Sequence, residues 1–364
     1  MATISPHLTR FLKTLLFILL FPFSVVYGFI VWLIELSYAQ GICTSRKSPV
    51  FSIGVGNITV GGTGKTPHTE FLIDQFLGKH TIATLSRGYG RKTKGFLAVT
   101  DQLGPAQVGD EPWQFFLKFG SRVKVNVGEK RVEAAEKIHA LYPSVDLLLM
   151  DDVFQHHAIQ ADFNILLCDY TNPFFKDYPF PAGRLREFRS GAKRADVIIV
   201  SKCPCSLSET EKQYFRKALH RYAPQGEVFF SAFVYGEAVP IFKTTINTPS
   251  SWVLVTGIAN PKPLRQHLEH HNALLKHLEY ADHHNFSDQE LEEIVSTYKG
   301  IKASNAGVLL TEKDYARLTE AAKNILKDVP LFYIPITVQL LEYEDLFWRK
   351  IMLAMQDHVT FQHK

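Results

Sequence analysis

A glycine-rich segment that ends in lysine and threonine offers the chemistry of phosphate binding. Residues 57–66 read N-I-T-V-G-G-T-G-K-T, between an apolar run at 50–55 and a segment with helical patterning. A strand, a loose turn and a helix start point backbone N–H groups and the positive end of a helix at an anion. Lys65 adds an ammonium for the phosphates, and Thr66 adds a hydroxyl for Mg²⁺. We interpret the segment as a P-loop, although G-x-x-x-x-G-K-[ST] expects glycine at Thr59; a plain strand–helix turn is the alternative. The phosphates of the nucleotide are expected against Thr59, Val60, Gly61, Gly62, Thr63, Gly64, Lys65 and Thr66.

Two adjacent acids follow an apolar segment further along the chain. Residues 145–150 read V-D-L-L-L-M, and Asp151 and Asp152 come next, at the expected C-terminal tip of a strand beside the P-loop. A carboxylate in this place can hold Mg²⁺. Because neighbouring side chains on a strand point to opposite faces, we expect only one acid, Asp151 first, to reach the metal. An acid that caps the following turn is the alternative for both residues.

Two further segments contain candidate proton acceptors. Asp110 lies in G-D-E-P, which reads as a loop that enters a helix, so it is either an N-cap or a base for the proton of a substrate hydroxyl. His283 and His284 lie in A-D-H-H-N-F-S, without another Cys or His at a spacing typical of zinc. One histidine could assist a base if two domains close over the substrate, and a solvated loop is the alternative.

Arginines in two glycine-containing loops suggest a second phosphate. Residues 86–91 read S-R-G-Y-G-R, and residues 181–187 read P-A-G-R-L-R-E. Guanidinium groups suit the oxygens of phosphate. Exposed loop arginines are common, but beside a P-loop they favour a phosphate on the acceptor.

Composition excludes several classes of protein. The chain has 364 residues, of which 46% are hydrophobic and 21% charged, and its net charge is +4. These values indicate a globular protein without a basic run for nucleic acid. Four cysteines are too few and too irregularly spaced for a disulfide framework, and a nucleotide site implies the reducing cytosol. No protein partner is evident from the sequence.

Residues 14–34 form an uncharged apolar stretch that is long enough to cross a hydrocarbon core of about 30 Å as a helix. Basic residues lie on both sides, so the positive-inside rule gives no orientation. If the P-loop is real, everything after the stretch is cytosolic. A cleaved signal peptide and a buried core helix are alternatives. Pro22, Ser24 and Gly28 leave open whether the helix spans the membrane or lies in its interface.

Alternating strands and helices predict an α/β fold: a P-loop NTPase-like parallel sheet, a smaller second α/β domain and the N-terminal hydrophobic helix. The expected limits are 1–40 for a membrane anchor, 41–235 for a P-loop kinase domain and 236–364 for a smaller C-terminal domain. Strands are expected at 81–85, 123–127, 145–150, 163–168, 197–200, 252–256, 308–310 and 331–334, with an extended region at 227–235. Helices are expected at 67–76, 129–142, 261–271, 314–326 and 343–355.

Seven short motifs in a fixed order carry a resemblance to a known family. They read N-I-T-V-G-G-T-G-K-T-P, L-S-R-G-Y-G-R, V-G-D-E-P, D-D-V-F-Q-H, A-G-R-L-R-E, D-H-H-N-F and T-E-K-D-Y, after an N-terminal hydrophobic helix. In this order they resemble the tetraacyldisaccharide 4′-kinases of lipid A biosynthesis over nearly the whole chain. Val153 stands where the family has glycine, which leaves both acids and His156 in place.

The resemblance implies transfer of the γ-phosphoryl of ATP to the 4′-hydroxyl of a tetraacyl glucosamine disaccharide 1-phosphate, which gives lipid IVA, on the cytosolic face of an inner membrane. It implies that Asp110 is the base and that His283 pairs with it, while the choice between His283 and His284 stays open. The remaining roles that it implies are phosphate and Mg²⁺ binding by Lys65 and Thr66, acidic positions around the metal at Asp151, Asp152 and Glu187, secondary candidates at Glu111 and His156, and a loose place near the nucleotide for 311–314.

Two other classes of protein compete with a kinase. A membrane-associated regulatory GTPase or ATPase would use its nucleotide state to drive binding, and it would need an N-K-x-D element, which Val200-Ser-Lys202-Cys imitates poorly. A lipid-binding scaffold with a dead nucleotide pocket is the other class. Intact Lys65, Thr66 and Asp151 argue against the scaffold.

Overall fold

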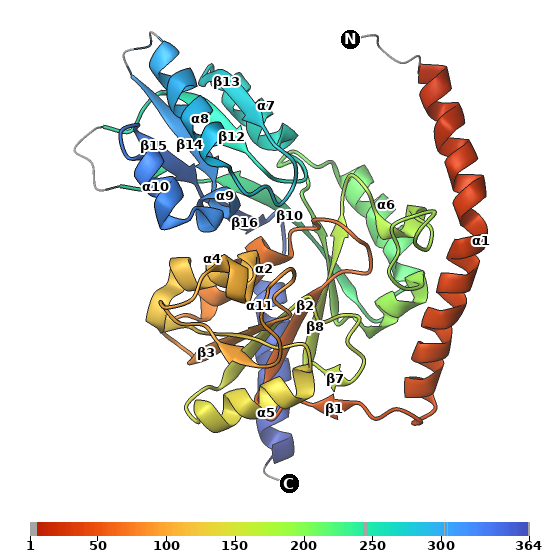
Figure 1. The fold of residues 1–364 in the computed structure, drawn as a ribbon. Coiled ribbons are helices and arrows are strands. Elements are labelled where there is room, and N and C mark those ends of the chain that lie inside the picture. The colour runs from red at the N-terminus through yellow and green to blue at the C-terminus, as the bar shows by residue number, and fades with distance from the viewer. Residues whose placement is uncertain (1–5, 243–246, 302, 304, 363–364) are drawn as a thin grey trace.

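The fold comes from a computed structural model, which describes residues 6–242, 247–301, 303 and 305–362. It has a long N-terminal helix, a larger body around a nine-stranded sheet and a smaller body around a five-stranded sheet (Figure 1). The predicted α/β class, with a P-loop kinase fold, a second smaller sheet and an N-terminal apolar helix, is confirmed.

The larger sheet is parallel except at its two edges. Its order is β16-β10-β9-β8-β2-β6-β3-β5-β4, and only the pairs β4·β5 and β10·β16 are antiparallel. Its strands are β2 (Ser52–Gly56), β3 (Ile82–Ser86), β4 (Leu97–Ala98), β5 (Lys124–Val127), β6 (Leu147–Asp151), β8 (Phe163–Asp169), β9 (Val197–Ser201), β10 (Glu227–Tyr235) and β16 (Ile336–Leu340). Ligands of such sheets bind at the carboxyl ends of the strands, which here places β2 and β6 beside each other at the expected site.

Helices cover both faces of the larger sheet, as they must when both faces are apolar. The α-helices are α2 (Lys65–Phe76), α3 (Pro105–Val108), α4 (Asp110–Phe119), α5 (Arg131–Leu141), α6 (Glu209–His220) and α11 (Glu344–Gln362), and the short 3₁₀ turns are Gly120–Arg122, Phe174–Lys176 and Arg189–Arg194. On one face Ile53 and Val55 of β2 share a core with Leu72 of α2 and with Phe347 and Ile351 of α11. A separate two-residue pair joins β1 (Arg46–Lys47) to β7 (Ile159–Gln160).

The smaller sheet has the order β11-β15-β14-β12-β13, and its pairs are parallel except β11·β15. Its strands are β11 (Val239–Pro240), β12 (Ser251–Thr256), β13 (Leu274–Glu279), β14 (Ala306–Thr311) and β15 (Leu331–Ile334). Its helices are α7 (Lys262–His270), α8 (Asp288–Gly300), α9 (Glu312–Arg317) and α10 (Glu320–Leu326). Helices α8 and α10 share one apolar core with the sheet, and α7 packs on the other face.

The expected single helix at 314–326 is wrong, because the chain forms two helices there. Leu318 is extended, and Thr319 caps a new helix by accepting a hydrogen bond at Oγ1 from the backbone N–H of Ala322, at 3.1 Å. A threonine that competes for backbone donors favours a helix start over a helix interior. The break gives α9 its own direction, which matters for the site below.

The division of the chain at 235/236 stays a prediction, and the two sheets refine it. Strand β16 follows the smaller sheet in sequence, yet it pairs with β10 at the edge of the larger sheet. Helix α11 follows it onto the larger body, where Phe347 and Ile351 are fully buried. We propose that residues 336–362 belong to the larger body and that the smaller body is an insertion between β10 and β16.

Helix α1 (Pro6–Ala39) runs alongside the larger body rather than through it (Figure 1). Its segment Thr14–Ala39 is, among the described residues, the one helix long and apolar enough to cross a membrane, with a mean hydropathy of 2.4 and 11% of the most apolar window buried. That low burial does not fit the alternative of a core helix. The helix is joined to the larger body by hydrogen bonds and ring contacts: Ser24 Oγ accepts from the N–H of Ala182 at 2.8 Å, and the Tyr27 hydroxyl donates to the carbonyl of Arg186 at 2.9 Å. The rings of Phe17 and Tyr38 contact Tyr178 and His157.

Candidate active site

The P-loop forms an open turn between β2 and α2. Gly61 and Gly64 adopt left-handed backbone angles, with φ of 103° and 91°. Only glycine fits at Gly64, because a Cβ there would also lie 2.6 Å from the Phe233 ring, whereas a Cβ at Gly61 would meet nothing within 4 Å. Asn57 steadies the turn by donating from Nδ2 to Thr63 Oγ1 at 2.8 Å. The loop is therefore held at its base and open at its tip, as a phosphate cradle requires.

A buried histidine supports the first turn of α2 from beneath. His68 Nδ1 lies 2.7 Å from the carbonyl oxygen of Gly64, and Nε2 lies 2.9 Å from Ser231 Oγ on β10. Burial lowers the pKa of His68 to about 4. The ring is therefore neutral near pH 7, and His68 fixes the position of the loop without adding charge.

Two residues at the end of β9 hold the loop from the side. Ser201 Oγ donates to the carbonyl oxygen of Thr63 at 2.8 Å. Lys202 has a left-handed φ of 61°, and its ammonium contacts both the carbonyl oxygen of Gly62 and Asp169 Oδ2, the latter at 2.7 Å. Ser201 and Lys202 belong to the segment that was compared with an N-K-x-D element, and here they support the backbone of the P-loop.

The adjacent acids after β6 face very different surroundings. Asp151, the last residue of the strand, is 5% exposed, its Oδ1 has no partner in the described part of the chain, and burial raises its pKa to about 7. Asp152 has left the strand with a φ of 51° and lies 3.6 Å from Lys65 and 2.8 Å from Arg186. Burial favours a high pKa for Asp152 as well, but Lys65 and Arg186 outweigh it and lower the pKa to about 2.

Asp110 and His283 come from the two bodies and meet at their boundary. Asp110, the first residue of α4, accepts at Oδ2 from His283, with the ring Nδ1 at 2.9 Å. Arg317 of α9 donates from Nε to the same oxygen at 2.7 Å. Burial favours a high pKa for Asp110, but Arg317 and the hydrogen bond from His283 outweigh it and lower the pKa. Among the described residues nothing bonds to Oδ1, which is left to accept a proton.

The loop that carries His283 is bent to present this side chain. His283 has a left-handed φ of 59°, and its backbone N–H donates to the carbonyl oxygen of Gly257, at 3.2 Å. Arg317 donates to the same carbonyl at 2.7 Å. The neighbouring His284 points elsewhere, to the carboxylate of Glu290 at 3.0 Å. The structure therefore brings His283 and not His284 to Asp110.

Comparison with known proteins identifies the chain. A family model described as tetraacyldisaccharide-1-P 4′-kinase matches residues 16–356. A tetraacyldisaccharide 4′-kinase of Flavobacterium psychrophilum is 38% identical over 346 residues, which cover 94% of this chain and 97% of that protein. The chain belongs to the tetraacyldisaccharide 4′-kinase family.

Further relatives agree with this membership. A tetraacyldisaccharide 4′-kinase of Bacteroides thetaiotaomicron is 35% identical, over 89% of each chain. A crystal structure described as the apo form of LpxK from Aquifex aeolicus in complex with ATP has the same fold, with a TM-score of 0.72 and 24% identity over 93% of this chain and 99% of that one. The interpretation as an ATP-dependent 4′-kinase of lipid A biosynthesis is confirmed, and a regulatory GTPase or ATPase is not favoured.

Glu187, which the resemblance to the kinase family placed near the metal, makes other contacts. It is 2% exposed, accepts from Gln155 at 2.7 Å and pairs with Arg194 at 2.5 Å. One ligand atom each from Glu187, Glu35 of α1 and His157 lie within 4.8 Å of one another. No contact in the described residues joins Glu187 to Thr66 or Asp151. Its role at the metal therefore remains a prediction that these contacts do not support.

The remaining candidate residues form hydrogen bonds or ion pairs with other groups of the protein. Glu111 pairs with Lys313 at 3.1 Å, in the motif expected near the nucleotide, and His156 Nε2 lies 3.0 Å from the carbonyl oxygen of Glu129. In the loops expected to face an acceptor phosphate, Arg91 binds Glu129 at 2.5 Å and Arg184 binds Asp177 at 2.7 Å. These arginines shape their loops.

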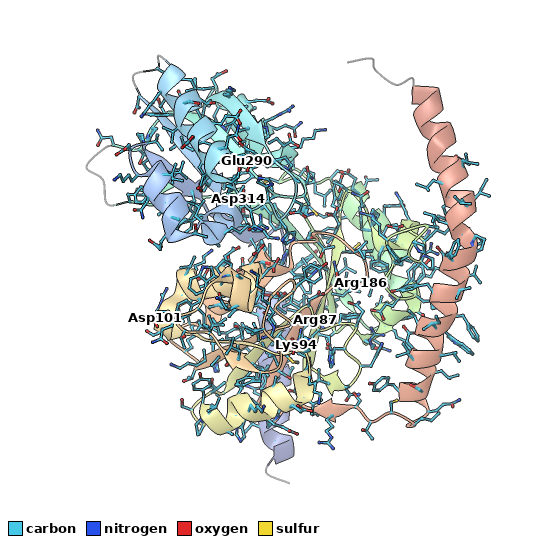
Figure 2. The ribbon with its side chains drawn as sticks, viewed as in Figure 1. Arg87, Lys94, Asp101, Arg186, Glu290 and Asp314 are labelled. Atoms are coloured by element: carbon cyan, nitrogen blue, oxygen red, sulfur yellow. The ribbon has the colours of Figure 1, made fainter. Side chains whose placement is uncertain are left out.

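Two arginines of the site make contacts that the sequence did not predict: Arg186 was expected to face an acceptor phosphate, and Arg317 received no role. Arg186, labelled in the larger body in Figure 2, holds Asp152, and Arg317 holds Asp110. Figure 2 places Asp314 in the smaller body, and Arg317 bonds this residue one helical turn away, at 3.2 Å. An acid and an arginine three residues apart on a helix were the signal available for Arg317.

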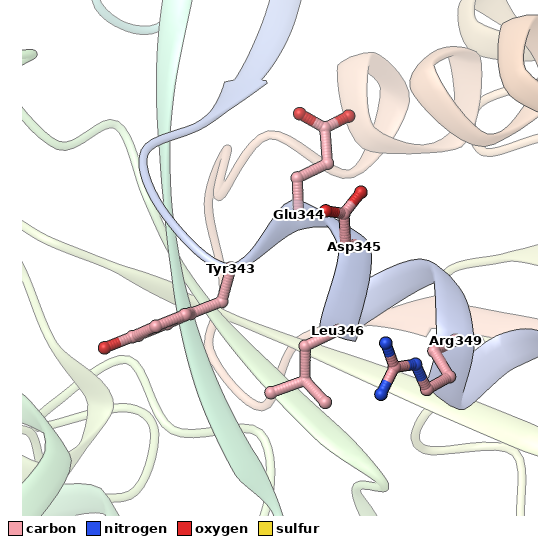
Figure 3. Close-up of a pocket in the computed structure, with 5 residues that line it drawn as sticks. All are labelled: Tyr343, Glu344, Asp345, Leu346 and Arg349. Atoms are coloured by element: carbon pink, nitrogen blue, oxygen red, sulfur yellow. The ribbon is translucent and has the colours of Figure 1, made fainter.

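A cavity of about 520 Å³ at the start of α11 lies apart from these groups (Figure 3). Its lining residues are Tyr343, Glu344, Asp345, Leu346 and Arg349. It contains none of the site residues predicted from the sequence, and Tyr343 points away from the two acids (Figure 3). We assign it no part in the reaction of the family.

Proposed function

We propose that this kinase transfers the γ-phosphoryl group of ATP to the 4′-hydroxyl of a tetraacyl glucosamine disaccharide 1-phosphate at the cytoplasmic surface of an inner membrane. The observation that supports this proposal best is the Asp110–His283 contact, because it joins a carboxylate and an imidazole from two bodies. A sugar hydroxyl is a poor nucleophile, and a positioned acceptor for its proton is what phosphoryl transfer to it requires.

The P-loop is proposed to hold the phosphates of ATP. Its exposed tip, from Val60 to Gly62, can offer the backbone N–H groups of Gly61 and Gly62, and Lys65 adds the ammonium at the start of α2. In the described structure this ammonium lies 3.6 Å from Asp152. Asp152 therefore holds Lys65 in place through an ion pair that the phosphates can replace, while Arg186 keeps Asp152 ionised.

Thr66 and Asp151 are proposed to hold Mg²⁺. The buried Oδ1 of Asp151, which lacks a donor among the described residues, fits a hard cation that prefers carboxylate oxygen. When bound, Mg²⁺ neutralises charge on the transferring phosphoryl group. Asp151 supplies a carboxylate oxygen for the cation at the end of β6. The ion pair of Lys65 with Asp152 balances the charge of the adjacent carboxylate.

Asp110 is proposed as the base and His283 as its partner. With Oδ2 held by His283 and Arg317, Oδ1, which none of the described residues binds, is the atom that accepts the proton of the 4′-hydroxyl. The lowered pKa makes Asp110 ionised at neutral pH, ready for this step. His283 donates its Nδ1–H to Oδ2, so it holds the carboxylate in position and stabilises its charge until Oδ1 takes the proton.

Helix α1 is proposed to anchor the enzyme in the membrane that contains its lipid substrate. Its apolar side chains are exposed along Thr14–Ala39, including Ile18, Leu19 and Phe23, each more than 60% exposed. Such a surface favours lipid over water. Use of ATP places both bodies on the cytoplasmic side.

Phosphoryl transfer by an Asp110→Asn variant tests this function. Purified protein in detergent receives ATP, Mg²⁺ and the lipid disaccharide 1-phosphate. We expect a loss of kcat of about 10²–10⁴-fold, the usual contribution of a general base, with the affinity for an ATP analogue within twofold of wild type. Asp345→Asn is the matched control, because Asp345 is an exposed acid in the first turn of α11. Full activity of Asp110→Asn would overturn the proposed base, and ATP hydrolysis that ignores the lipid would overturn the function.

A further inference from the structure

Three charged side chains meet at the boundary of the two bodies, outside the site described above. Glu70 lies on α2, Lys118 lies on α4 and Glu312 is the first residue of α9. The side chains of Glu70 and Glu312 are 3% and 10% exposed. Groups so deeply placed are not an ordinary surface ion pair, so their arrangement is fixed by the packing of the three helices.

One ammonium serves both carboxylates. Lys118 Nζ lies 2.6 Å from Glu70 Oε2 and 3.1 Å from Glu312 Oε1. Gln114, one turn earlier on α4, donates from Nε2 to Glu70 Oε1 at 2.8 Å. In the described part of the chain neither carboxylate has another ion-pair partner. Removal of Lys118 would thus leave two buried acids facing each other without a cation.

Helices α4 and α9 lie against each other in opposite directions and are joined at both ends. Asp110 at the start of α4 binds Arg317 at the end of α9, at 2.7 Å. Lys118 near the end of α4 binds Glu312 at the start of α9, at 3.1 Å. Eight residues of helix separate Asp110 from Lys118 on α4 by about 12 Å. Glu111 of α4 also pairs with Lys313 of α9, at 3.1 Å, beside Asp110. Two of these three ion pairs hold the start of α4, whereas Lys118–Glu312 holds its end, so loss of Lys118–Glu312 leaves that end free to pivot.

We propose that Lys118 is a positioning residue for phosphoryl transfer, whose ammonium clamps Glu312 of the smaller body to Glu70 of the P-loop helix and so keeps His283 on Asp110. The proposal rests on the function proposed above, in which the Asp110–His283 contact accepts the proton. It adds a part of the enzyme that touches neither nucleotide nor lipid.

The clamp connects the elements that carry the reacting groups. Helix α2 begins with Lys65, so Glu70 moves with the P-loop. The segment that carries His283 is bonded through the carbonyl oxygen of Gly257 to Arg317, so it moves with α9. A change of angle between α4 and α9 would therefore separate His283 from Asp110 while the P-loop keeps its shape.

A Glu312→Gln variant tests the clamp, because it removes the Lys118–Glu312 ion pair between the bodies and leaves Lys118 paired with Glu70. We measure kcat and KM for the lipid disaccharide 1-phosphate with ATP and Mg²⁺, and separately the affinity for an ATP analogue. We expect kcat to fall at least fivefold, with the affinity for the analogue within twofold of wild type. Glu133→Gln is the matched control, because it removes the exposed Lys130–Glu133 pair within α5.

Two variants of Lys118 complete the experiment. Lys118→Met leaves both acids without a cation and should lower kcat more than Glu312→Gln does. Lys118→Arg restores a cation with several donors and should recover at least half of the wild-type kcat. If Lys118→Met does not fold, Glu312→Gln decides alone.

A role in stability only predicts a different result. In that case Glu312→Gln would lower the melting temperature and keep the wild-type kcat at temperatures well below it, which would overturn the clamp. Wild type is the reference for the proposed function: if it transfers phosphoryl to the lipid and Asp110→Asn does not, a normal kcat for Glu312→Gln refutes the clamp alone. If wild type transfers nothing to the lipid, both proposals are wrong.

Discussion

Two residues of the same type at the site have very different surroundings. Asp151 and Asp152 are identical and adjacent, yet burial raises the pKa of Asp151 to about 7, whereas Lys65 and Arg186 outweigh burial at Asp152 and lower its pKa to about 2. The sequence predicted that only one acid of the two could face the metal. It did not predict the left-handed turn at Asp152 or the arginine that holds it, because both depend on a loop more than thirty residues away in the chain.

The two adjacent histidines are expected to respond differently to substitution. His283→Gln should lower kcat by about 10²-fold or more, because the partner of the base is lost. His284→Gln removes the contact with Glu290, so it should destabilise its loop by about 1 kcal/mol and keep kcat at temperatures where the protein stays folded. Steady-state kinetics and thermal unfolding of both variants check this. The reverse order of the two kcat values would show that the assignment within the pair is wrong.

Stability should fall with rising pH because of Glu70. Burial and the nearby Glu312 raise the pKa of Glu70 to about 7 from 4.5, so the folded state binds this proton more tightly than the unfolded chain does. This contribution is fully present below pH 4.5 and is lost as the pH rises through 7. The groups that face Glu70 and Glu312 are Lys118 and Gln114 on α4, Asp74 on α2 and Tyr333 on β15, with the N–H of Ile336 bonded to Glu312.

A Glu70→Gln variant isolates this effect. Between pH 5 and 8 the free energy of unfolding of wild type should fall relative to Glu70→Gln by about 2–3 kcal/mol, the energy of the shift in pKa. Urea unfolding at several pH values measures the difference. Parallel curves for the two proteins would contradict the assignment of the proton to Glu70, whereas His68, whose pKa is lowered, contributes equally to both.

At the scale of elements, periodicity found the buried strands and missed those at the edges. Strands β2, β3, β6 and β9 are buried at every position and β8 at all but Asn164, and their mostly apolar sequences are easy to recognise. Strand β13 reads L-L-K-H-L-E with no fully buried position, so its sequence carries no clear pattern. Strand β16 is recognised only once β10 offers its free edge. Such strands are set by tertiary pairing more than by propensity.

Helix α1 should lose its hold on membranes when charge enters its exposed apolar surface. Leu19 and Val26 are 65% and 60% exposed, and their replacement by Glu places two carboxylates in the expected hydrocarbon region. Placing one acid at the centre of a bilayer costs about 2.5–3.5 kcal/mol, so binding to vesicles should fall at least 100-fold. Flotation of the full chain with vesicles measures this.

Leu141→Glu is the control for α1, because Leu141 is a similarly exposed leucine at the end of α5, with 57% exposed. It should float with vesicles as wild type does. The double variant of α1 should keep its affinity for an ATP analogue within twofold, since the P-loop lies on the larger body. Unchanged flotation of the double variant would remove the membrane role of α1.

At the scale of the whole molecule, the chain leaves the larger body after β10 and returns to it with β16 and α11. The sequence predicted both α/β units and the order of the motifs, but a linear division at 235/236 could not describe a return. Only long-range packing joins Phe347 to Val55 and Leu72, residues nearly 300 positions earlier. The same kind of long-range contact creates the Asp110–His283 pair. The motifs suggested this pair through resemblance, and the fold supplies it from α4 and the loop that carries His283.

The return of the chain predicts that the stability of the P-loop body depends on α11. Phe347 is fully buried between α2 and β10, where it contacts Phe71 and Phe229 with ring centroids at 6.4 and 5.3 Å. Phe347→Ala should lower the free energy of unfolding by about 3–5 kcal/mol, and the loss should appear in the unfolding transition that an ATP analogue shifts. Leu353→Ala, at an exposed position of α11, should change it by less than about 1 kcal/mol. If α11 belonged to the smaller body, Phe347→Ala would instead leave the transition that responds to the nucleotide unchanged, because the P-loop and its core would then unfold independently of that helix.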